Sequence, residues 1–403
     1  MTPAPRPCTE RDRPSASLAC CTFSKLGSMN DSTHILLLDP FHGGSHAAWS
    51  RGVRDGLAQQ GHFVELKTFP ANHWKWRMQG AAALWAHELQ DVTPPDILLT
   101  TDMCDLAQLK GLLPSSWHGV KCVVMFHENQ LTFPWSLTDN DPNLGRDLAY
   151  SYINVSSALA ADQVWFNSAH HRNAFLHAVD VWMSKMPKPR LSRPAARIAA
   201  QSHVVHLGLN FEGWDALKPD VPTDWTSCDV PVLLWNQRWS WDKGTDAWME
   251  LVHDILQHDI PAEFVVLGES KGRLPEGWDT MRDNMGNRCL QWGYADSKED
   301  YVQWLWRSTV APLAPKQEYF GLALVEAMRC EVMPWVPESH AYLETMPEGH
   351  QFMPADQWLN ALLHQTWKTW PATPQAYRQK ADSFSWRNVI PLMDRLIQQA
   401  LSS

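Results

Sequence analysis

Short apolar runs separated by longer amphipathic stretches recur along most of this chain. The run 34–40, HILLLDP, is apolar on both faces and ends at Asp-Pro, which is typical of a buried strand in a parallel sheet. The stretch 47–61 has helical spacing and ends at Gly61, a common residue just beyond a helix. We predict further strands at 62–70, 96–101, 121–128, 162–168 and 202–208, and then at 230–239, 262–270, 289–295 and 308–315. Strands that alternate with helices in this way predict doubly wound α/β sheets.

These elements fall into two Rossmann-like domains, which we place at 34–211 and 230–380. The intervening residues 212–229 are rich in Pro and Asp and are predicted to form a linker, and 381–403 is an amphipathic C-terminal helix. Residues 1–33 are predicted to be largely a disordered leader, and whether translation starts at Met1 or Met29 is left open. Two such domains facing each other across a cleft bind ligands beyond the carboxyl ends of their strands.

Bulk composition narrows the class of protein. The chain has 403 residues and a net charge of −10, which disfavours a general nucleic-acid binder. We expect no membrane-spanning helix and no membrane partner, because no run of about 18 apolar residues occurs. The 8 cysteines include no CxxC pair, so we expect reduced thiols in a cytoplasmic protein rather than a zinc site or a disulfide framework.

A local cluster of cations and a high content of tryptophan each have two possible explanations. Residues 184–203 contain no acid and carry the cations Lys185, Lys188, Arg190, Arg193 and Arg197. A solvated Pro-rich loop and a phosphate-contacting patch are both compatible with this pattern. The 23 tryptophans could pack in cores or stack on bases and sugars, and composition does not separate these alternatives.

Two glutamates, Glu318 and Glu326, frame an otherwise apolar segment. If a helix begins at Gly321, Glu318 lies in the loop before it and Glu326 lies on its second turn. Free N–H groups at the helix N-terminus attract an anion, and carboxylates accept hydrogen bonds from hydroxyl groups. This arrangement suits a nucleotide diphosphate sugar, which has a diol on each side of its diphosphate. The alternative is a loop acid and a helix acid that both face solvent.

Two loops predicted at strand ends could contact such a ligand. Arg238 and Lys243 follow the first strand of the second domain, where two cations can neutralise a diphosphate, although an ordinary exposed loop is the alternative. Gly43 and Gly44 in FHGGSH allow close backbone approach to a ligand. This motif is not GxGxxG, so dinucleotide binding is disfavoured.

A third candidate, His127 to Gln130, follows the strand 121–128. We expect these four polar residues to be exposed together and to face the cleft. Asp102 and Asp105 are too far apart for a metal-binding DxD pattern, and no metal is expected. The absence of GxSxG, HExxH and P-loop motifs disfavours hydrolases and kinases.

The motifs together resemble a known family. The spacing Glu318-x7-Glu326, with Arg238-x4-Lys243, resembles the family-4 retaining glycosyltransferases of GT-B fold. More specific motifs resemble the tRNA-queuosine alpha-mannosyltransferases over about residues 34–388. These motifs are DPFHGGSH, FPANHWKWRMQGAA, MFHENQLTFP, VWFNSAHHRNAFL, NQRWSWDKG, VLGES, QWGYADSKEDY, QEYFGLALVEAM and FSW.

The resemblance implies a reaction and a donor site. GDP-mannose would be the donor, the cyclopentene-diol of queuosine at the wobble position of tRNA-Asp the acceptor, and no metal or other cofactor would be needed. Glu318 would hold the mannose hydroxyls, Glu326 the ribose, and Arg238 and Lys243 the diphosphate, with His127 near the reacting carbon. The other donor-binding residues would be Gly43, Gly44, Gly268, Tyr294, Phe320, Gly321 and Leu322.

The resemblance also implies which residues contact the acceptor tRNA, a part in which members of the family differ. Expected tRNA-binding residues are His46, Trp74, Lys75, Trp76, Arg77, Glu128, Asn129, Gln130, Lys185, Lys188, Arg190 and Arg193. The HWKWR stretch, 73–77, suits an anticodon loop by stacking and phosphate pairing, or else is an amphipathic stretch with packed tryptophans. Animal-type members carry a long polar insertion before the second domain that is short here. A glycosyltransferase with a lipid or polysaccharide acceptor, and a catalytically silent binding protein, are the competing hypotheses.

Overall fold

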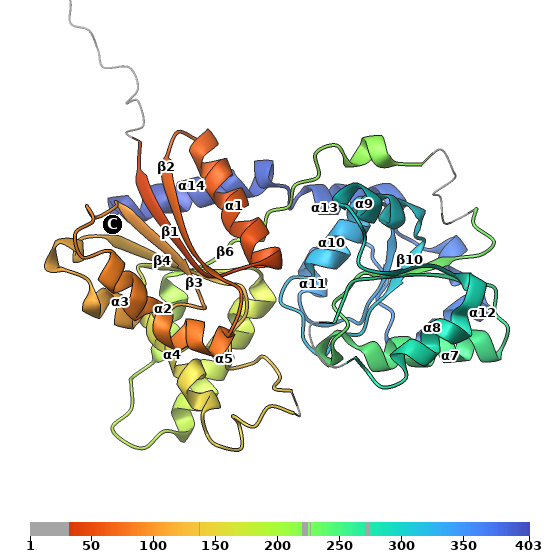
Figure 1. The fold of residues 1–403 in the computed structure, drawn as a ribbon, viewed down its shortest axis with the longest axis horizontal. Helices are drawn as coiled ribbons and strands as arrows, with labels where there is room; N and C mark the ends of the chain where they lie inside the picture. Colours follow the sequence, from red (N-terminus) through yellow and green to blue (C-terminus); the bar gives the residue numbers. More distant parts are fainter. Residues whose placement is uncertain (1–31, 137, 220–224, 226, 271–273) are drawn as a thin grey trace, which may run out of the picture. The chain divides into compact units, whose positions relative to one another are not determined.

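A computed structural model describes residues 32–136, 138–219, 225, 227–270 and 274–403. Almost all of the predicted leader, 1–33, therefore lies outside the described residues, as does part of the predicted linker. Residues 33–403 form one compact unit that contains two parallel sheets with helices packed around them (Figure 1). None of the helices in the described ranges is long and apolar enough to cross a bilayer.

In the described part of the first half, 6 strands form one parallel sheet in the order β2-β1-β3-β4-β5-β6. Its strands are β1 (His34–His42), β2 (Phe63–Pro70), β3 (Ile97–Thr101), β4 (Lys121–Phe126), β5 (Gln163–Phe166) and β6 (Ser202–Val204). Its helices are α1 (Gly44–Gln59), α2 (Trp74–Glu88), α3 (Leu106–Leu112), α4 (Asp147–Ala160), α5 (Ala169–Lys185) and α6 (Pro194–Ala200). The direction of strand order changes between β1 and β3, which is where such sheets bind ligands.

In the second half, the described residues form a 5-stranded parallel sheet in the order β11-β10-β7-β8-β9. Its strands are β7 (Val232–Trp235), β8 (Glu263–Leu267), β9 (Cys289–Gly293), β10 (Val310–Pro312) and β11 (Met333–Trp335). Its helices are α7 (Thr245–Gln257), α8 (Trp278–Met285), α9 (Lys298–Arg307), α10 (Leu322–Arg329), α11 (Tyr342–Thr345), α12 (Trp358–Leu363) and α13 (Pro374–Asp382). Here strand order changes direction between β7 and β10, so the loops that follow these two strands are neighbours.

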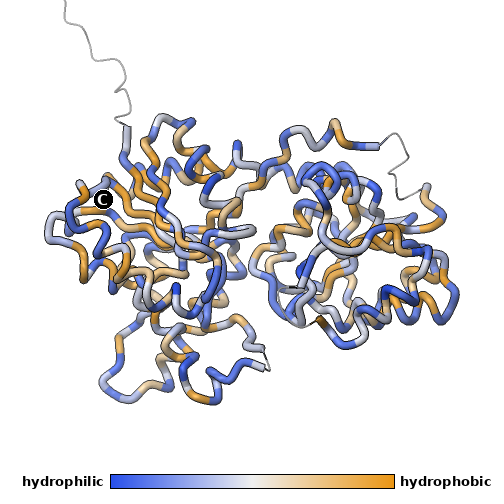
Figure 2. Tube along the Cα trace, in the orientation of Figure 1, coloured by the Kyte–Doolittle hydropathy of each residue, from blue (hydrophilic) through white to orange (hydrophobic). Residues whose placement is uncertain are grey.

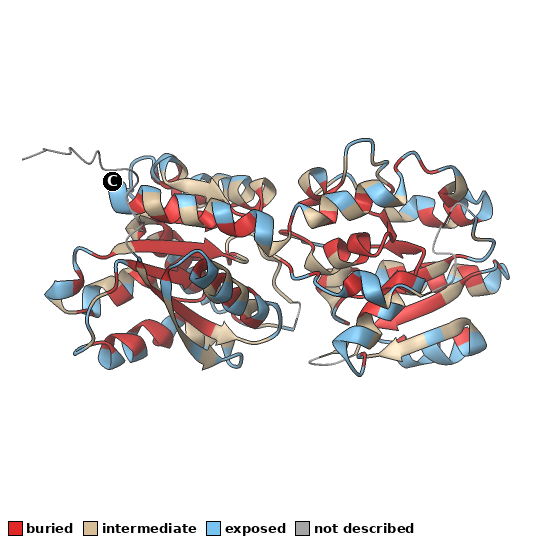
Figure 3. Ribbon diagram, turned by 90° about the horizontal axis from the view of Figure 1, so that it is seen from above, coloured by how far each residue is buried: buried red, intermediate tan, exposed pale blue. Residues whose placement is uncertain are grey.

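Both sheets are buried on two faces, as the continuous apolar runs predicted. The strands are the most hydrophobic parts of the trace and are mostly buried, while the outer helix faces are polar and exposed (Figures 2 and 3). Tryptophan supplies many of the largest fully buried side chains, among them Trp165, Trp235 and Trp306. Most of the unusual tryptophan content among the described residues is therefore core packing. The prediction of two Rossmann-like α/β sheets is confirmed.

The last helix, α14 (Trp386–Ser402), packs against the first half of the chain rather than the second (Figure 1). Any side chain added at Gly52 or Gly208 would collide with the Trp386 ring, at 2.2 and 2.1 Å. His62 of the first half lies 2.9 Å from Asp394 of α14, measured between Nε2 and Oδ1. The chain leaves the first half after Leu209 and returns to it near Ser385. These two segments lie side by side, because Leu209 pairs with Ser385 in a parallel bridge.

Candidate active site

The loops after β7 and β10 bring Lys243 and Glu318 together. Lys243 Nζ lies 2.9 Å from Glu318 Oε2, and the two side chains are only 13% and 12% exposed. Gly244, with φ +80°, lets this loop approach β10, since a Cβ there would lie 2.3 Å from the Ala314 carbonyl oxygen. A cation and a carboxylate that are 75 residues apart in sequence thus meet at the carboxyl end of the second sheet.

Glu318 is fixed by the helix that follows it. Its Oε1 accepts hydrogen bonds from the backbone N–H of Gly321 at 3.0 Å and of Phe320 at 3.4 Å. The expectation that these N–H groups are free for a ligand anion is therefore wrong for Phe320 and Gly321. Leu322 begins α10, and Gly321 before it has φ +90°. The carboxylate lies at the helix N-terminus, where the dipole of the helix stabilises its negative charge.

Glu326 lies on α10 and is held by two partners on α9. Tyr301 donates its hydroxyl to Glu326 Oε2 at 2.7 Å, and Lys298 Nζ lies 2.9 Å from Oε1. Burial and the charge of Glu326 raise the pKa of Tyr301 well above its usual value, so the tyrosine remains a donor. The two glutamates therefore have separate partners, which agrees with their predicted places in the loop and on the helix.

Arg238 leaves the end of β7 largely in solvent. Its side chain is 62% exposed and its Nη2 is 3.6 Å from Asp242 Oδ2. Burial lowers the pKa of His46, in the other half, and the charge of Arg238 acts in the same direction. A largely exposed cation in the loop after β7 thus lies within electrostatic range of the first half.

Gly268, after β8, is packed against the loop that carries Arg238. Its φ is +112°, and a Cβ there would lie 2.5 Å from the carbonyl oxygen of Gln237. Tyr294, which follows β9, is 73% exposed. The structure places both residues at strand ends of the second sheet.

In the first half, His127 follows β4 and stacks on His46 of α1. The ring centroids are 4.6 Å apart, and burial lowers the pKa of His127 well below its usual value. Its backbone N–H donates to buried Asp102 at 2.8 Å, and its Nε2 has no partner among the described residues. Gly43 precedes α1 and Gly44 is its first residue, two positions before His46. A Cβ at Gly44 would meet open space. The imidazole is therefore neutral, and its Nε2 is not hydrogen-bonded to any described residue.

The expectation that residues 127–130 are exposed together is wrong. Asn129 and Gln130 are buried, at 0% and 7% exposure, whereas His127 and Glu128 are partly exposed. The side-chain amide of Asn129 instead stabilises the turn that follows it, because its Oδ1 accepts hydrogen bonds from the N–H groups of Leu131 and Thr132 at 3.1 and 3.0 Å. Four polar residues after an apolar strand need not face solvent when a side chain closes the turn.

Tyr319 joins the two halves, and sequence reasoning missed it. Its hydroxyl lies 2.8 Å from the Thr132 hydroxyl and 3.3 Å from Asn129 Nδ2. Its ring stacks on His171 with centroids 4.1 Å apart. The available signal was a tyrosine directly after Glu318, within a segment that otherwise reads as apolar.

A second contact between the halves involves Glu344 of α11. Its two carboxylate oxygens accept from the N–H groups of Ala169 and His170, at 2.8 and 2.9 Å. These groups begin α5, so one half supplies an anion to the helix N-terminus of the other. His206 Nε2 lies 3.5 Å from the same carboxylate.

The predicted acceptor residues in HWKWR are mostly engaged within the first half. Lys75 Nζ lies 2.8 Å from Asp139 Oδ2 and 2.6 Å from Asp141 Oδ2. Arg77 donates to Asn72 Oδ1 at 2.8 Å, whereas Trp76 is 55% exposed. Lys75 and Arg77 lie in the first turn of α2, and the two Lys75 contacts join this helix to the loop before α4.

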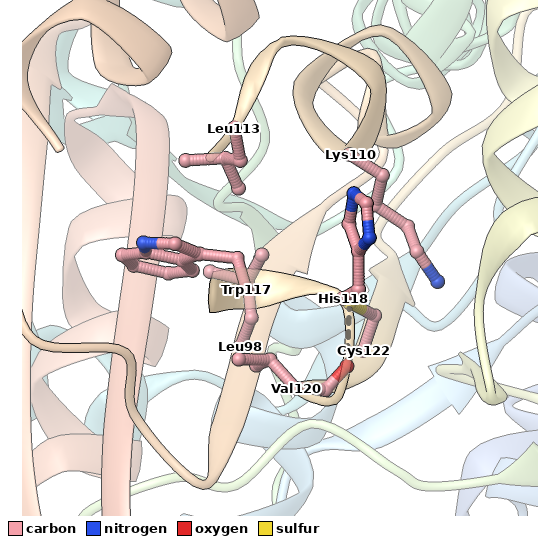
Figure 4. A pocket seen from close by; sticks show the side chains of 7 residues that line it. All are labelled: Leu98, Lys110, Leu113, Trp117, His118, Val120 and Cys122. Atoms are coloured by element: carbon pink, nitrogen blue, oxygen red, sulfur yellow. Dashed lines mark hydrogen bonds between the residues drawn. The ribbon is translucent and has the colours of Figure 1, made fainter. Parts of the chain in front are cut away.

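The small cavity shown in Figure 4 lies away from all of these residues. It is lined by Leu98, Lys110, Leu113, Trp117, His118, Val120 and Cys122, and its volume is about 20 Å³. That volume is close to what one water molecule needs. Within the described ranges, His, Cys, Asp and Glu side chains form no group of three or more that could hold a metal ion.

Comparisons with known proteins bear on both halves. Residues 34–209 match the family described as tRNA-queuosine alpha-mannosyltransferase N-terminal. A relative named tRNA-queuosine alpha-mannosyltransferase, from Drosophila melanogaster, is 27% identical over 355 residues. That match covers 87% of this chain and 90% of the relative.

Solved structures share the fold at low identity. Sucrose-phosphate synthase from Thermosynechococcus elongatus has a TM-score of 0.65 and 16% identity, covering 92% of this chain and 99% of that one. Starch synthase IV from Arabidopsis thaliana, bound to ADP and acarbose, has a TM-score of 0.65 and 12% identity, covering 93% and 100%.

The two parallel sheets and these matches define a glycosyltransferase of GT-B fold. Over residues 34–209 the chain is similar to the tRNA-queuosine alpha-mannosyltransferase N-terminal family. The resemblance inferred from the motifs is thereby confirmed.

Proposed function

We propose that this glycosyltransferase transfers mannose from GDP-mannose to the cyclopentene-diol of queuosine in tRNA-Asp, in the cytoplasm. The observation that carries the proposal is the contact between Lys243 and Glu318 at the N-terminus of α10, at 2.9 Å. It combines a phosphate-binding cation with a hydroxyl-binding carboxylate in a chain whose first half matches the queuosine family. The Drosophila relative carries the same acceptor in its name.

In this proposal the donor lies along the carboxyl edge of the second sheet. Glu326 binds the ribose, while Lys243 and Arg238 neutralise the diphosphate. The mannose hydroxyls are held by Glu318, whose position at the helix N-terminus is fixed by backbone hydrogen bonds. Lys243 then contacts both Glu318 and the phosphate. Binding of the donor therefore weakens the ion pair between Lys243 and Glu318 and forms a new one between Lys243 and the phosphate.

The chemical step retains configuration at the anomeric carbon. The bond from that carbon to the phosphate oxygen breaks, and its electron pair leaves with GDP. The acceptor hydroxyl forms its new bond on the same face, and its proton passes to the leaving phosphate oxygen. The charge that develops on the diphosphate is stabilised by Lys243 and Arg238, which lie in the loop after β7. No metal or other cofactor takes part in the proposed step.

The first half supplies the acceptor side. His127 is neutral because burial lowers its pKa, and its ring position is fixed by His46. A neutral imidazole near the reacting carbon can accept or donate one hydrogen bond to a sugar hydroxyl without adding charge.

The test incubates the purified chain with GDP-mannose and queuosine-containing tRNA, then digests the tRNA and weighs its nucleosides. A queuosine heavier by one hexose, absent with Glu318→Ala, is the expected result. Release of GDP without any gain on the tRNA would contradict the acceptor and direct the search to lipid or polysaccharide acceptors. Absence of both would contradict the donor as well.

A further inference from the structure

A strongly basic surface lies at the far end of α5 from the active site. It is formed by Lys185, Lys188, Arg190, Arg193 and Arg197, and all five residues are exposed. None of them forms an ion pair with any residue that the structure describes. The nearest acid in sequence is Asp180, on α5 itself. In a chain with a net charge of −10, this concentration of unpaired cations favours a polyanionic ligand.

Two aromatic side chains lie near the end of α5 that leads into this basic surface. Trp182 of α5 lies beside Tyr152 of α4, with ring centroids 6.0 Å apart, and Tyr152 is 54% exposed. Cations next to accessible rings are typical of surfaces that contact phosphates and stack on unpaired bases. The longer helix of this region, α5, buries Phe175, Val179 and Met183 in the protein, and α6 has only 7 residues, which disfavours an amphipathic membrane-binding helix.

Helix α5 connects this surface to the active site. His171, in its first turn, stacks on Tyr319, the residue next to Glu318. At 1.5 Å per residue, Lys185 lies roughly 21 Å further along the helix axis. A single nucleoside bound beside Glu318 could not reach the basic surface, whereas a folded RNA could.

We propose that the basic surface binds the phosphate backbone of the acceptor RNA at least about 20 Å from the nucleoside that is modified. The inference rests on the proposed function for its choice of acceptor. The surface that binds the RNA backbone is then separate from the site where the nucleoside is modified. RNA binding then contributes mainly to the KM for tRNA and depends on salt through released counterions.

The experiment compares wild type with the triple variant Lys188→Ala/Arg190→Ala/Arg193→Ala in the full chain. The control triple variant, Arg51→Ala/Arg387→Ala/Arg395→Ala, removes the same charge from exposed arginines of α1 and α14 that make no ion pair with described residues. Binding of queuosine-containing tRNA is measured over a range of salt concentrations, and mannosylation is measured in parallel.

We expect the basic-surface variant to bind tRNA at least 10-fold more weakly, and the control less than twofold more weakly. The slope of log K against log salt should decrease by about 2 to 3, because each lost phosphate contact contributes roughly 0.7 to 0.9. The KM for tRNA should rise with little change in kcat. Circular dichroism of both variants checks that the fold is retained.

Equal losses in both triple variants, or no loss in either, would overturn the inference. So would tighter binding of vesicles rich in anionic lipid than of tRNA, since the surface would then be a membrane contact. Because tRNA binding is measured without turnover, failure of mannosylation alone would overturn the proposed function and not the assignment of this surface.

Discussion

The hydroxyl of Tyr319 lies 2.8 Å from the hydroxyl of Thr132 and thereby joins the loop that carries Glu318 to the loop after β4. The same tyrosine ring stacks on His171 at the start of α5. A residue adjacent to the proposed sugar-binding carboxylate is thus positioned by the first half of the chain. The proposed donor and acceptor sides are coupled through this contact.

Replacing Tyr319 with Phe should lower kcat for tRNA mannosylation by about 3- to 10-fold. The change removes the hydrogen bonds of the hydroxyl to Thr132 and Asn129, of which the 2.8 Å contact to Thr132 is the shorter, while the stacked ring remains. A typical hydrogen bond contributes about 0.5 to 1.5 kcal/mol. Steady-state kinetics at saturating donor measures the effect. Tyr342→Phe is the matched control, since the buried Tyr342 hydroxyl has no partner among the described residues.

The role of Tyr319 also predicts how it combines with Thr132. Thr132→Val removes the other side of the same hydrogen bond, so the double variant should be no slower than about the worse single variant. Effects that simply multiply would show that the two hydroxyls act independently.

Lys243→Ala should reduce mannosyl transfer by about 100-fold or more, as expected when a preorganised group that stabilises the leaving charge is removed. The loss should appear in kcat, because the charge on the diphosphate increases in the transition state. Lys316→Ala is the control: this lysine is 44% exposed, near the same loop, and 3.4 Å from Asp246. Unchanged turnover in Lys243→Ala would remove this residue from the mechanism.

Gly268→Ala and Gly293→Ala separate backbone strain from a steric collision. Both glycines have positive φ, +112° and +106°, and either substitution introduces strain of about 1 to 3 kcal/mol. A Cβ at Gly268 would also lie 2.5 Å from the Gln237 carbonyl oxygen, whereas one at Gly293 would meet nothing within 4 Å. The free energy of unfolding should therefore fall further in Gly268→Ala, and the KM for GDP-mannose should rise because the collision displaces the loop of Arg238. Equal effects of the two variants would contradict the collision.

The stability of the protein should decrease as pH falls below about 6.5, the ordinary pKa of histidine. Burial lowers the pKa of His350 to about 4 in the folded chain. Between these values the unfolded state binds a proton that the folded state does not, so stability falls with pH. From pH 6.5 to 5.0 this one group should remove roughly 2 kcal/mol.

Urea unfolding of wild type and His350→Phe at pH 6.5 and 5.0 measures that contribution. The variant should lose less stability over the interval, although burial also lowers the pKa of other histidines, such as His127 and His171, which act in the same direction. His364→Phe, at an exposed histidine, should behave as wild type. The same pH dependence in His350→Phe as in wild type would contradict the assignment.

Sequence alone determined the class of fold and much of the second-half site. Apolar runs such as 34–40 are long enough to require burial on both faces, and the intervening helices then impose parallel pairing. The positions of Arg238, Lys243 and Glu318 after predicted strands followed directly, because the carboxyl ends of parallel strands share one edge. Glu326 was correctly placed on the helix, since the glycine at 321 marked where α10 begins.

Tertiary structure alone decided which polar groups are occupied and which remain free. Asn129 and Gln130 are buried because a turn closes around the Asn129 amide, and no periodicity reports that closure. Lys75 and Lys188 look alike in sequence, yet one lies between two aspartates and the other makes no ion pair with any described residue. The link from Tyr319 to Thr132 joins residues 187 positions apart. Contacts of that range depend on how the two sheets pack together, which local residue patterns do not encode.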